Sequence, residues 1–372
     1  MLPAACQYAP KIKKGFLKNV TTSEDLTDRA TEEPSNQGAE PSDAQNPAAK
    51  YWIGFDLGGT KMQCCLFDEK LKKIAERKRR TRQDLGVEAG LDRIADTIEK
   101  ALSEAQVDRS QLLGIGIGCP GPVEWDTGIV RVAVNLGWKN VKVRSFLSER
   151  FGCPVEVLND VDAGVYGEYI AGAGKGSRTT VGIFPGKGVG GGCVYDGQIL
   201  RGRHLSCMEI GHIKISSSTS SCGSDMSGTL EAEASRLAVA GELAKLAFRG
   251  EAPHLYEAVG TDVGAIRSKV IFEAIAAGDK EVEKVLSRAC EIIGQGIANV
   301  VLLICPDCVV LGGGLIEAMP ERFLKQIISS AKKGVFECYR DQFEIRVAKL
   351  GTDAGAVGCA AWTAKMVAQR NA

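Results

Sequence analysis

Short apolar runs that end at glycine or proline alternate along most of the chain with longer segments of helical periodicity. The run 51–57 predicts a buried strand that ends at Gly58, and residues 62–68 and 73–82 predict a second strand and a more exposed third one. Residues 86–106 have apolar side chains at helical spacing. A start of strand, turn and strand separates this pattern from a Rossmann domain, which begins with strand, turn and helix.

The same order recurs in the second half, where residues 179–200 predict a strand, a glycine turn, a strand and an Asp-Gly hairpin. The other predicted elements are strands at 112–123, 155–160, 308–315 and 343–350, and helices at 161–173, 229–247, 267–304 and from Ala354 onward. Two halves that each begin with a glycine-rich β-turn-β predict two α/β lobes around a cleft. We expect a small lobe over 51–170 and a large lobe over 171–372, and the closing helix can return to the small lobe.

Residues 1–50 differ from the rest of the chain. They are mildly basic up to Val20 and then rich in Ser, Thr, Glu, Asp, Pro and Ala, with almost no large apolar residue. Such a stretch cannot bury enough surface to offset its ordering entropy, so a disordered tail is predicted. A transit peptide is the alternative, and the many acidic residues after position 23 argue against it.

Lys plus Arg and Asp plus Glu both number 46, so the formal net charge is zero. A balanced chain has no bulk attraction to nucleic acid or to an anionic membrane, and an anionic ligand must be held by local geometry. No apolar run reaches about 18 residues, so no transmembrane helix is expected. We predict a cytoplasmic chain without nucleic-acid or membrane partners.

The 13 cysteines raise the alternatives of a disulfide framework and a metal site. Disulfide frameworks belong to short secreted chains, which this chain does not resemble. A reduced cysteine in an apolar, glycine-rich run acts as a small core residue. We therefore favour reduced thiols, in particular at five such positions: Cys64, Cys119, Cys193, Cys305 and Cys359.

The first glycine turn, Gly58-Gly59, is flanked by Asp56, Thr60 and Lys61. Glycines let the backbone approach a phosphate, and free N–H groups in such a turn form an anion nest. Thr60 and Lys61 add a hydroxyl and a cation, and Asp56 can hold Mg²⁺ directly or through water. The alternative is a plain hairpin with glycine at positions of positive φ. The spacing is not that of a Walker loop.

Two more glycine turns follow predicted strands. Residues 186–192 contain glycine at every position except Lys187 and Val189, which suits a second phosphate loop or, equally, a flexible hairpin. The turn 312–314 follows a buried strand and would suit close packing against the base and ribose of a nucleotide.

Asn159 and Asp160 stand at the end of a predicted strand, where side chains point into the cleft of an α/β sheet. Phosphoryl transfer to an alcohol needs one carboxylate there to accept the hydroxyl proton. The alternative is a helix N-cap, for which either Asp160 or Asp162 would serve.

Glu209, His212 and, further on, Glu231 form another polar set. Two carboxylates and an imidazole can bind several sugar hydroxyls. A lone histidine is more often a satisfied structural residue, but here the two glutamates favour binding.

Taken in order, DLGGTK, PGPV, NLGW, NDVDAGVYGE, GVGGG, EIGH, Glu231, LGGG and DAGAVG resemble the ROK family of sugar kinases and repressors, within the hexokinase–actin superfamily. The resemblance runs from about Ile53 to the C-terminus. It implies an α/β fold of the two-lobed actin-like ATPase type, with ribonuclease-H-like domains around a central cleft. It also implies ATP and Mg²⁺ as cofactors, a small-molecule sugar as substrate and, often, a homodimer, for which helices within 229–304 could supply the interface.

The resemblance further implies a role for each motif residue. Asp160 would be the general base, placed near the sugar 6-hydroxyl, with glucose as the leading substrate. The sugar would be bound by Asn135, Asn159, Asp160, Glu209, His212 and Glu231. ATP would be held by Asp56, Gly58, Gly59, Thr60, Lys61, Gly186, Lys187, Gly188, Gly190, Gly312, Gly313 and Gly314.

Three departures from the family pattern stand out. The zinc motif CxCGxxGCxE is degraded, because Ser220 and Thr229 stand where its outer cysteines belong; Cys222 and His212 alone are too few ligands, so no zinc is predicted. Asp162 replaces the last Asn of NDxN, and a second carboxylate can raise the pKa of Asp160. Lys187 replaces a Thr and presents a point charge to a phosphate, which could change the phosphoryl donor.

Other functions stay open. A kinase for N-acetylglucosamine, N-acetylmannosamine, fructose or allose fits the same motifs, and the changes at Asp162 and Lys187 allow a sugar sensor without turnover. A transcriptional regulator would need an N-terminal winged helix, and residues 1–50 are too short and too acidic for one.

Overall fold

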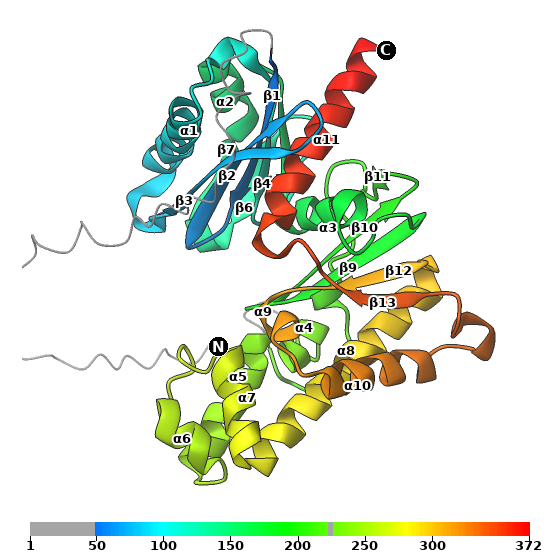
Figure 1. Cartoon of the computed structure of the whole chain (residues 1–372). Helices are drawn as coiled ribbons and strands as arrows, with labels where there is room; N and C mark the ends of the chain where they lie inside the picture. The colour runs from blue at the N-terminus through cyan, green and yellow to red at the C-terminus, as the bar shows by residue number, and fades with distance from the viewer. Residues whose placement is uncertain (1–48, 222–225) are drawn as a thin grey trace, which may run out of the picture. The chain divides into compact units, whose positions relative to one another are not determined.

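The computed structural model describes residues 49–221 and 226–372 (Figure 1). The predicted tail lies outside the described residues except for its last two positions, and so does Cys222 of the degraded zinc motif. The division into lobes at residue 170 stays a prediction.

The first sheet has five strands in the order β3–β2–β1–β4–β8. Their bounds are β1 Tyr51–Leu57, β2 Lys61–Asp68, β3 Lys73–Arg80, β4 Leu112–Cys119 and β8 Val155–Asn159. The pairs β1–β2 and β2–β3 are antiparallel, whereas β1–β4 and β4–β8 are parallel. The charged, partly exposed β3 lies at the edge, where lysines and arginines discourage pairing with another chain.

The second sheet repeats this arrangement in the order β11–β10–β9–β12–β13. Its strands are β9 Thr179–Pro185, β10 Val189–Tyr195, β11 Gln198–Ile199, β12 Cys308–Leu311 and β13 Glu344–Val347. Again the hairpin β9–β10 is antiparallel, and β9–β12 and β12–β13 are parallel. Asp196 and Gly197 turn the chain with φ of 47° and 72°, which confirms the predicted hairpin.

A third, three-stranded sheet was not predicted: β5 Val123–Glu124, β6 Ile129–Ala133 and β7 Trp138–Lys142. Helices α2, α6, α9 and α10 were missed as well, and α9 begins within the predicted strand 308–315, whereas the predicted helices are present. The helices are α1 Gly86–Glu104, α2 Val143–Phe151, α3 Asp160–Ala171, α4 Leu230–Ala234, α5 Arg236–Phe248, α6 Pro253–Val259, α7 Ser268–Ala277, α8 Lys280–Ile304, α9 Gly314–Glu317, α10 Glu321–Lys333 and α11 Ala354–Asn371.

Helix α11 follows the second sheet in the chain but packs against β1, β4 and α3, alongside the first sheet (Figure 1). Glycines make this contact possible. A Cβ on Gly358 would lie 1.7 Å from the Ala163 carbonyl oxygen, and one on Gly54 would lie 1.9 Å from that of Ala356. The backbones therefore touch directly, and any side chain at these positions would force them apart.

The described cysteines are free thiols. Four of the five expected core positions, Cys64, Cys119, Cys193 and Cys359, are fully buried. The expectation was wrong for Cys305, which is exposed, because it ends α8 in the left-handed conformation with φ of 51° and turns away from the core.

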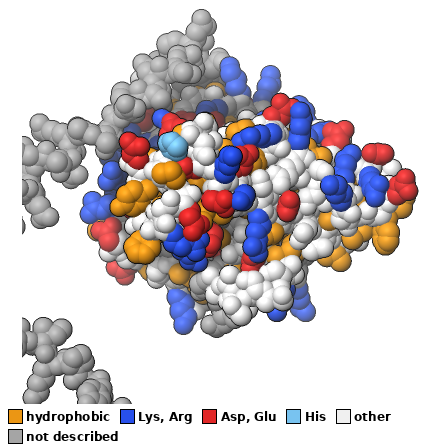
Figure 2. Space-filling view, turned by 90° about the horizontal axis from the view of Figure 1, so that it is seen from below, with side chains coloured by type: hydrophobic (Ala, Val, Ile, Leu, Met, Phe, Trp, Pro, Cys, Tyr) orange, Lys and Arg blue, Asp and Glu red, His pale blue; other side chains and the backbone are white. Residues whose placement is uncertain are grey.

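Within the described part of the chain, α8 has the length and apolar composition to cross a membrane. Half of its most apolar window is buried, and the helix packs against α10, α4 and α5, as the core helix of a folded domain does. Figure 2 shows basic, acidic and hydrophobic side chains interspersed on the face seen from below, without a patch of one sign.

Candidate active site

The first glycine turn is contacted by Thr81, which directly follows β3, and by η3 (Val134–Leu136). The Thr81 hydroxyl donates to the Gly58 carbonyl oxygen at 2.7 Å, and a Cβ on Gly59 would lie 3.2 Å from the Cβ of Asn135. Neither glycine has a positive φ, so the plain-hairpin explanation for them is wrong. Gly58 is needed because a Cβ there would lie 2.7 Å from the Lys61 carbonyl oxygen, whereas a Cβ at Gly59 would make only a tight contact with Asn135.

Asp56 precedes this turn on β1, and its carboxylate faces the start of α11. A Cβ on Gly355 would lie 3.0 Å from the Asp56 carboxyl carbon. Burial raises the pKa of Asp56 to about 6, and no positive charge among the described residues offsets this effect. A carboxylate of this kind fits a divalent cation, which would supply the missing charge.

The second and third glycine turns lie next to each other, because β9 and β12 are neighbours. The Gly312 amide donates to the Ile183 carbonyl, and a Cβ on Gly313, whose φ is 89°, would lie 2.7 Å from the Pro185 carbonyl oxygen. Lys187 is exposed in the second turn, and open space surrounds the Cβ position of Gly314. Lys187 and Gly314 are therefore accessible to a ligand.

Gly190 differs from the other glycines expected to bind the cofactor. It lies in β10, and a Cβ there would be 2.6 Å from Val161 on α3. Gly191 and Gly192 are equally enclosed, by Ile210 and by Val165. These three glycines let α3 and the chain around Ile210 pack closely on β10. The turn itself lies at 186–188, where the Gly186 amide donates to the Gly188 carbonyl oxygen at 2.7 Å.

Asp160 begins α3 at the end of β8, but it does not cap the helix. The Asn159 side-chain oxygen accepts from the amides of Val161 at 2.9 Å and Asp162 at 3.1 Å. The expectation that Asp160 or Asp162 would be the cap was wrong, because the extended backbone of Asn159 aims its side chain at these two amides. The Asn159 amide nitrogen donates to the Gly121 carbonyl, so both ends of this side chain are engaged within the protein.

The Asp160 carboxyl is thus left for chemistry, in acidic surroundings. Burial and, next, the negative charge of Asp56 raise its pKa to about 7, against the hydrogen bond from the Val161 amide. Glu209, at the N-terminal end of η4 (Ile210–His212), raises this pKa further. Carboxyl groups from β1, α3 and the η4 segment therefore form one electrostatic centre, and a group with a pKa near neutrality suits proton transfer.

Glu231 and the segment that carries His212 both lie against Val189, which follows the second turn. The Glu231 carboxylate accepts from the Val189 amide at 2.7 Å, and Thr229 caps α4 through its hydroxyl. The Nδ1 atom of His212 is buried without a hydrogen-bond partner among the described residues. A buried imidazole nitrogen without a partner calls for an explanation, and a hydrogen bond to a ligand would supply one.

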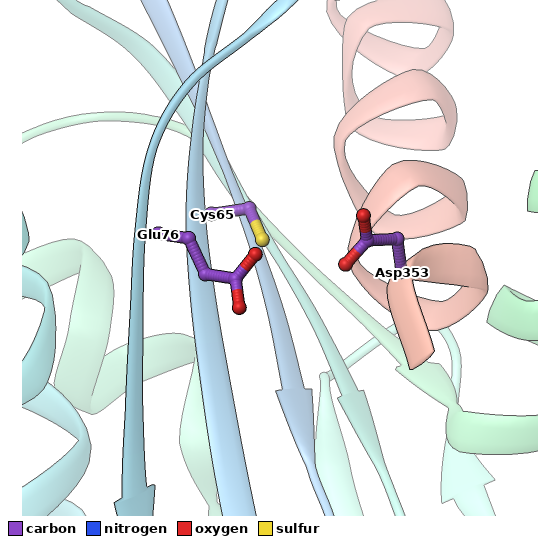
Figure 3. A group of neighbouring side chains, drawn as sticks. All are labelled: Cys65, Glu76 and Asp353. Carbon is purple, nitrogen blue, oxygen red and sulfur yellow. The ribbon is translucent and has the colours of Figure 1, made fainter. Parts of the chain in front are cut away.

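Cys65, Glu76 and Asp353 face one another from β2, β3 and the start of α11, at metal-ligand separations (Figure 3). The Lys73 ammonium already bridges Glu76 at 2.7 Å and Asp353 at 2.6 Å, and Gln63 donates to Asp353. Burial raises the pKa of Cys65 to about 12, so this thiol stays protonated. The group is an ion-pair cluster that fastens α11 to the first sheet.

Sequence reasoning missed two residues of the site, Thr81 and Ser206. The Ser206 hydroxyl donates to the Asp162 carboxylate, and Thr81 holds the first turn. Both partners are distant in sequence, and the local sequence gives no signal for either contact.

Two sheets with the same strand order, each opened by a hairpin whose turn is rich in glycine, define the actin-like ATPase fold with its ribonuclease-H-like domains. Residues 52–366 match the sequence profile of the ROK family, and the chain belongs to this family.

Several known proteins are similar over most of their length. A glucokinase of Halalkalibacterium halodurans is 34% identical over 318 residues, which cover 83% of this chain and 93% of the relative. A xylose repressor of Caldicellulosiruptor bescii is 29% identical over 94% of this chain and 90% of the relative. The crystal structure of a ROK family glucokinase from Streptomyces griseus in complex with glucose and AMPPNP has a TM-score of 0.71 and 28% identity, covering 84% of this chain and 98% of that one.

Proposed function

We propose that the protein transfers the γ-phosphoryl group of ATP to the 6-hydroxyl of a hexose, with glucose as the leading substrate. One observation carries the proposal: Asn159 caps α3, so the adjacent Asp160 carboxyl, whose pKa burial and Asp56 raise to about 7, is free to act as a base. Asp160 accepts the hydroxyl proton as the sugar oxygen bonds to phosphorus and the bond to the ADP oxygen breaks.

The three glycine turns would bind the nucleotide. Gly58, Gly59 and Gly188 would offer backbone amides to the phosphates, with Thr60, Lys61 and Lys187 adding a hydroxyl and two cations. The Gly186 amide already donates to the Gly188 carbonyl oxygen, so Gly186 would shape the second turn without donating to a phosphate. Asp56 would hold Mg²⁺, which neutralises charge on the phosphates when bound. A cavity of about 220 Å³ beside the third turn, lined by Leu311, Leu324, Ile328 and Val347 among others, supports placing the base near Gly312–Gly314.

Asn135, Glu209, His212 and Glu231 would bind the sugar hydroxyls. The orphaned Nδ1 of His212 supports a role in binding. Asn159 would position Asp160 and α3 and would bind sugar less directly, since its amide oxygen and nitrogen are both already hydrogen-bonded within the protein. Buried polar groups that pair with hydroxyls discriminate strongly against sugars that lack them.

Glucose is favoured because glucokinases are among the similar proteins. A kinase for N-acetylglucosamine, N-acetylmannosamine or fructose, or a weakly active sugar sensor, is the alternative. We also propose a cytoplasmic homodimer. Phe248 at the end of α5 and Leu303 at the end of α8 are 82% and 80% exposed, which supports an interface there.

The proposal is tested with the purified full chain, Mg-ATP and a panel of hexoses and N-acetylhexosamines, with ADP release coupled to a readout. Glucose should give the highest kcat/KM and sugar 6-phosphate as product. Binding of a sugar without any ADP release would overturn the kinase function and leave the sensor.

A further inference from the structure

Asp162 stands two residues after Asp160, at a position where the ROK-like motif has an asparagine. Its side chain is 1% exposed. One carboxyl oxygen accepts from the Ser206 hydroxyl, and the other is buried and has no hydrogen-bond partner among the described residues. An ionised carboxylate left half unsatisfied in the protein interior is costly.

The groups around Asp162 do not favour a negative charge. The orphaned oxygen faces β10, where a Cβ on Gly192 would lie 3.2 Å away. Burial comes first among the causes that raise the pKa of Asp162 to about 7, and the charges of Asp160 and Glu209 raise it further. The Ser206 hydrogen bond and the Arg201 charge act against them. The other titratable neighbours on facing elements are Cys193 of β10 and Cys207.

We propose that Asp162 is a positioning residue that works as a neutral carboxylic acid, holding a proton so that Asp160, and not the pair, carries the negative charge at the start of α3. The inference rests on the proposed role of Asp160 as base. Two carboxyl groups this close in one buried region resist ionising together, and the first proton leaves from one of them. Asp160 is partly exposed and Asp162 is buried, so Asp160 is the carboxyl group that ionises first.

Protonated Asp162 has the shape and the zero charge of the asparagine it replaces, but it can lose its proton. Ionisation would place a second negative charge beside Asp160, and the Ser206 hydrogen bond, which favours the ionised form, offsets only part of this cost. Ser206 belongs to the segment that leads into Glu209, one of the expected sugar ligands. The proton on Asp162 therefore leaves Asp160 as the single negative charge at the start of α3, while the Ser206 hydrogen bond joins Asp162 to this segment in either state.

The first test measures thermal stability against pH without sugar or nucleotide. A buried group whose pKa is raised stabilises the fold at low pH, and this stabilisation is lost as the pH rises through the folded-state pKa. Between about pH 4 and pH 7 the wild type should therefore lose Tm, and Asp162→Asn should reduce this loss by roughly a third, since Asp56 and Asp160 keep their shares. Asp196→Asn is the matched control, because Arg178 lowers the pKa of this exposed aspartate and it titrates below the range.

Ser206→Ala is the second variant. It removes the hydrogen bond that favours ionised Asp162, so the loss of Tm should move to higher pH. In carboxyl-¹³C NMR of aspartate-labelled protein, one resonance should titrate near neutrality. The pKa read from this resonance should be higher in Ser206→Ala, and the resonance should be absent in Asp162→Asn. An unchanged Tm–pH slope in Asp162→Asn, or no aspartate resonance near neutrality that responds to Ser206→Ala, overturns the proposal.

The pH profile of kcat/KM connects Asp162 to catalysis. The wild-type profile should show two coupled ionisations, from Asp160 and Asp162, and the Asp162→Asn profile should show only that of Asp160. An Asp162→Asn profile that still shows two ionisations contradicts the proposal. If the wild type phosphorylates no sugar, the proposed function fails, whereas the stability and NMR results still decide the state of Asp162.

Discussion

The Glu231 carboxylate accepts a hydrogen bond from the Val189 amide at 2.7 Å. A residue expected to bind sugar is thus attached to Val189, which begins β10 directly after the turn residues 186–188. The contact leaves no room for a side chain at Gly188, where a Cβ would lie 2.1 Å from a Glu231 carboxylate oxygen. The proposed sugar and phosphate sites would share this carboxylate, and disturbing it should affect both substrates.

Replacing Glu231 by alanine should lower kcat/KM for the sugar and raise KM for ATP. A charge-assisted hydrogen bond contributes about 1.5–3 kcal/mol, which corresponds to roughly a 10- to 100-fold loss. Steady-state kinetics with each substrate varied in turn measures the effect. Glu231→Gln keeps an acceptor for the Val189 amide, so it should restore the KM for ATP more fully than the kcat/KM for the sugar. A KM for ATP that Glu231→Ala leaves unchanged would show that other bonds hold the turn.

Asp160→Asn should abolish most turnover and spare sugar binding. Removing a positioned general base costs about 10²- to 10⁴-fold in kcat. Calorimetry should find sugar affinity within a few-fold of the wild type, because the variant keeps a side chain of the same shape beside the intact Asn159 cap. Turnover near the wild-type rate would disprove the assignment of the base.

The activity should depend on pH in a defined direction. Burial and Asp56 raise the pKa of Asp160 to about 7, and the base works only when ionised, so kcat/KM should rise as the pH increases through that value. Below it the protonated fraction grows and the rate should fall about tenfold per pH unit. Initial rates in buffers of constant ionic strength test this, and a rate that is flat down to about pH 5 would contradict a base with a raised pKa.

Gly358→Ala should destabilise the fold strongly. The new Cβ would lie 1.7 Å from the Ala163 carbonyl oxygen, so α11 would have to move away from α3. Overpacking of this kind costs about 1–3 kcal/mol or more, visible as a lower Tm and a lower urea midpoint. The control is Gly241→Ala on α5, where nothing lies within 4 Å of the added Cβ and the better helix propensity of alanine should hold or raise Tm.

Chelation of zinc should leave the fold intact. Thr229, at an outer cysteine position of the degraded zinc motif, caps α4, and the Ser216 hydroxyl donates to Glu233 at 3.2 Å. Both bonds hold the segment around α4 without a metal. Elemental analysis should find no stoichiometric zinc, and EDTA should not change Tm. A Tm that falls with EDTA and returns with zinc would show that the remaining ligands suffice.

The sequence predicted the duplicated sheets because glycine turns between apolar runs are local signals. It did not predict the sheet β5–β7, whose strands are two to five residues long and partly exposed, so that no period is established. Helix α10 did leave a signal: Phe323, Ile327 and Ala331 are spaced four apart and are buried. That pattern was overlooked.

The sequence proposed the residues of the candidate site, but it could not predict the bonds among them. Three residues in a row of four, Asn159, Asp160 and Asp162, can each cap a helix, and the exit of the chain from β8 decides among them in favour of Asn159. Ser206 and Asp162 are 44 residues apart, and their contact depends on how the segment after β11 returns to α3. Tertiary packing sets both outcomes.

The position of α11 has a consequence for the synthesis of the protein. Its residues, 354–371, cover β1 and β4, which emerge from the ribosome some hundreds of residues earlier. Until then the face of the first sheet that α11 covers has no partner, and the backbone contacts at Gly54 and Gly116 cannot form. The first half of the chain therefore completes its folding only after the last helix has been made, and it depends on protection of that face in the meantime.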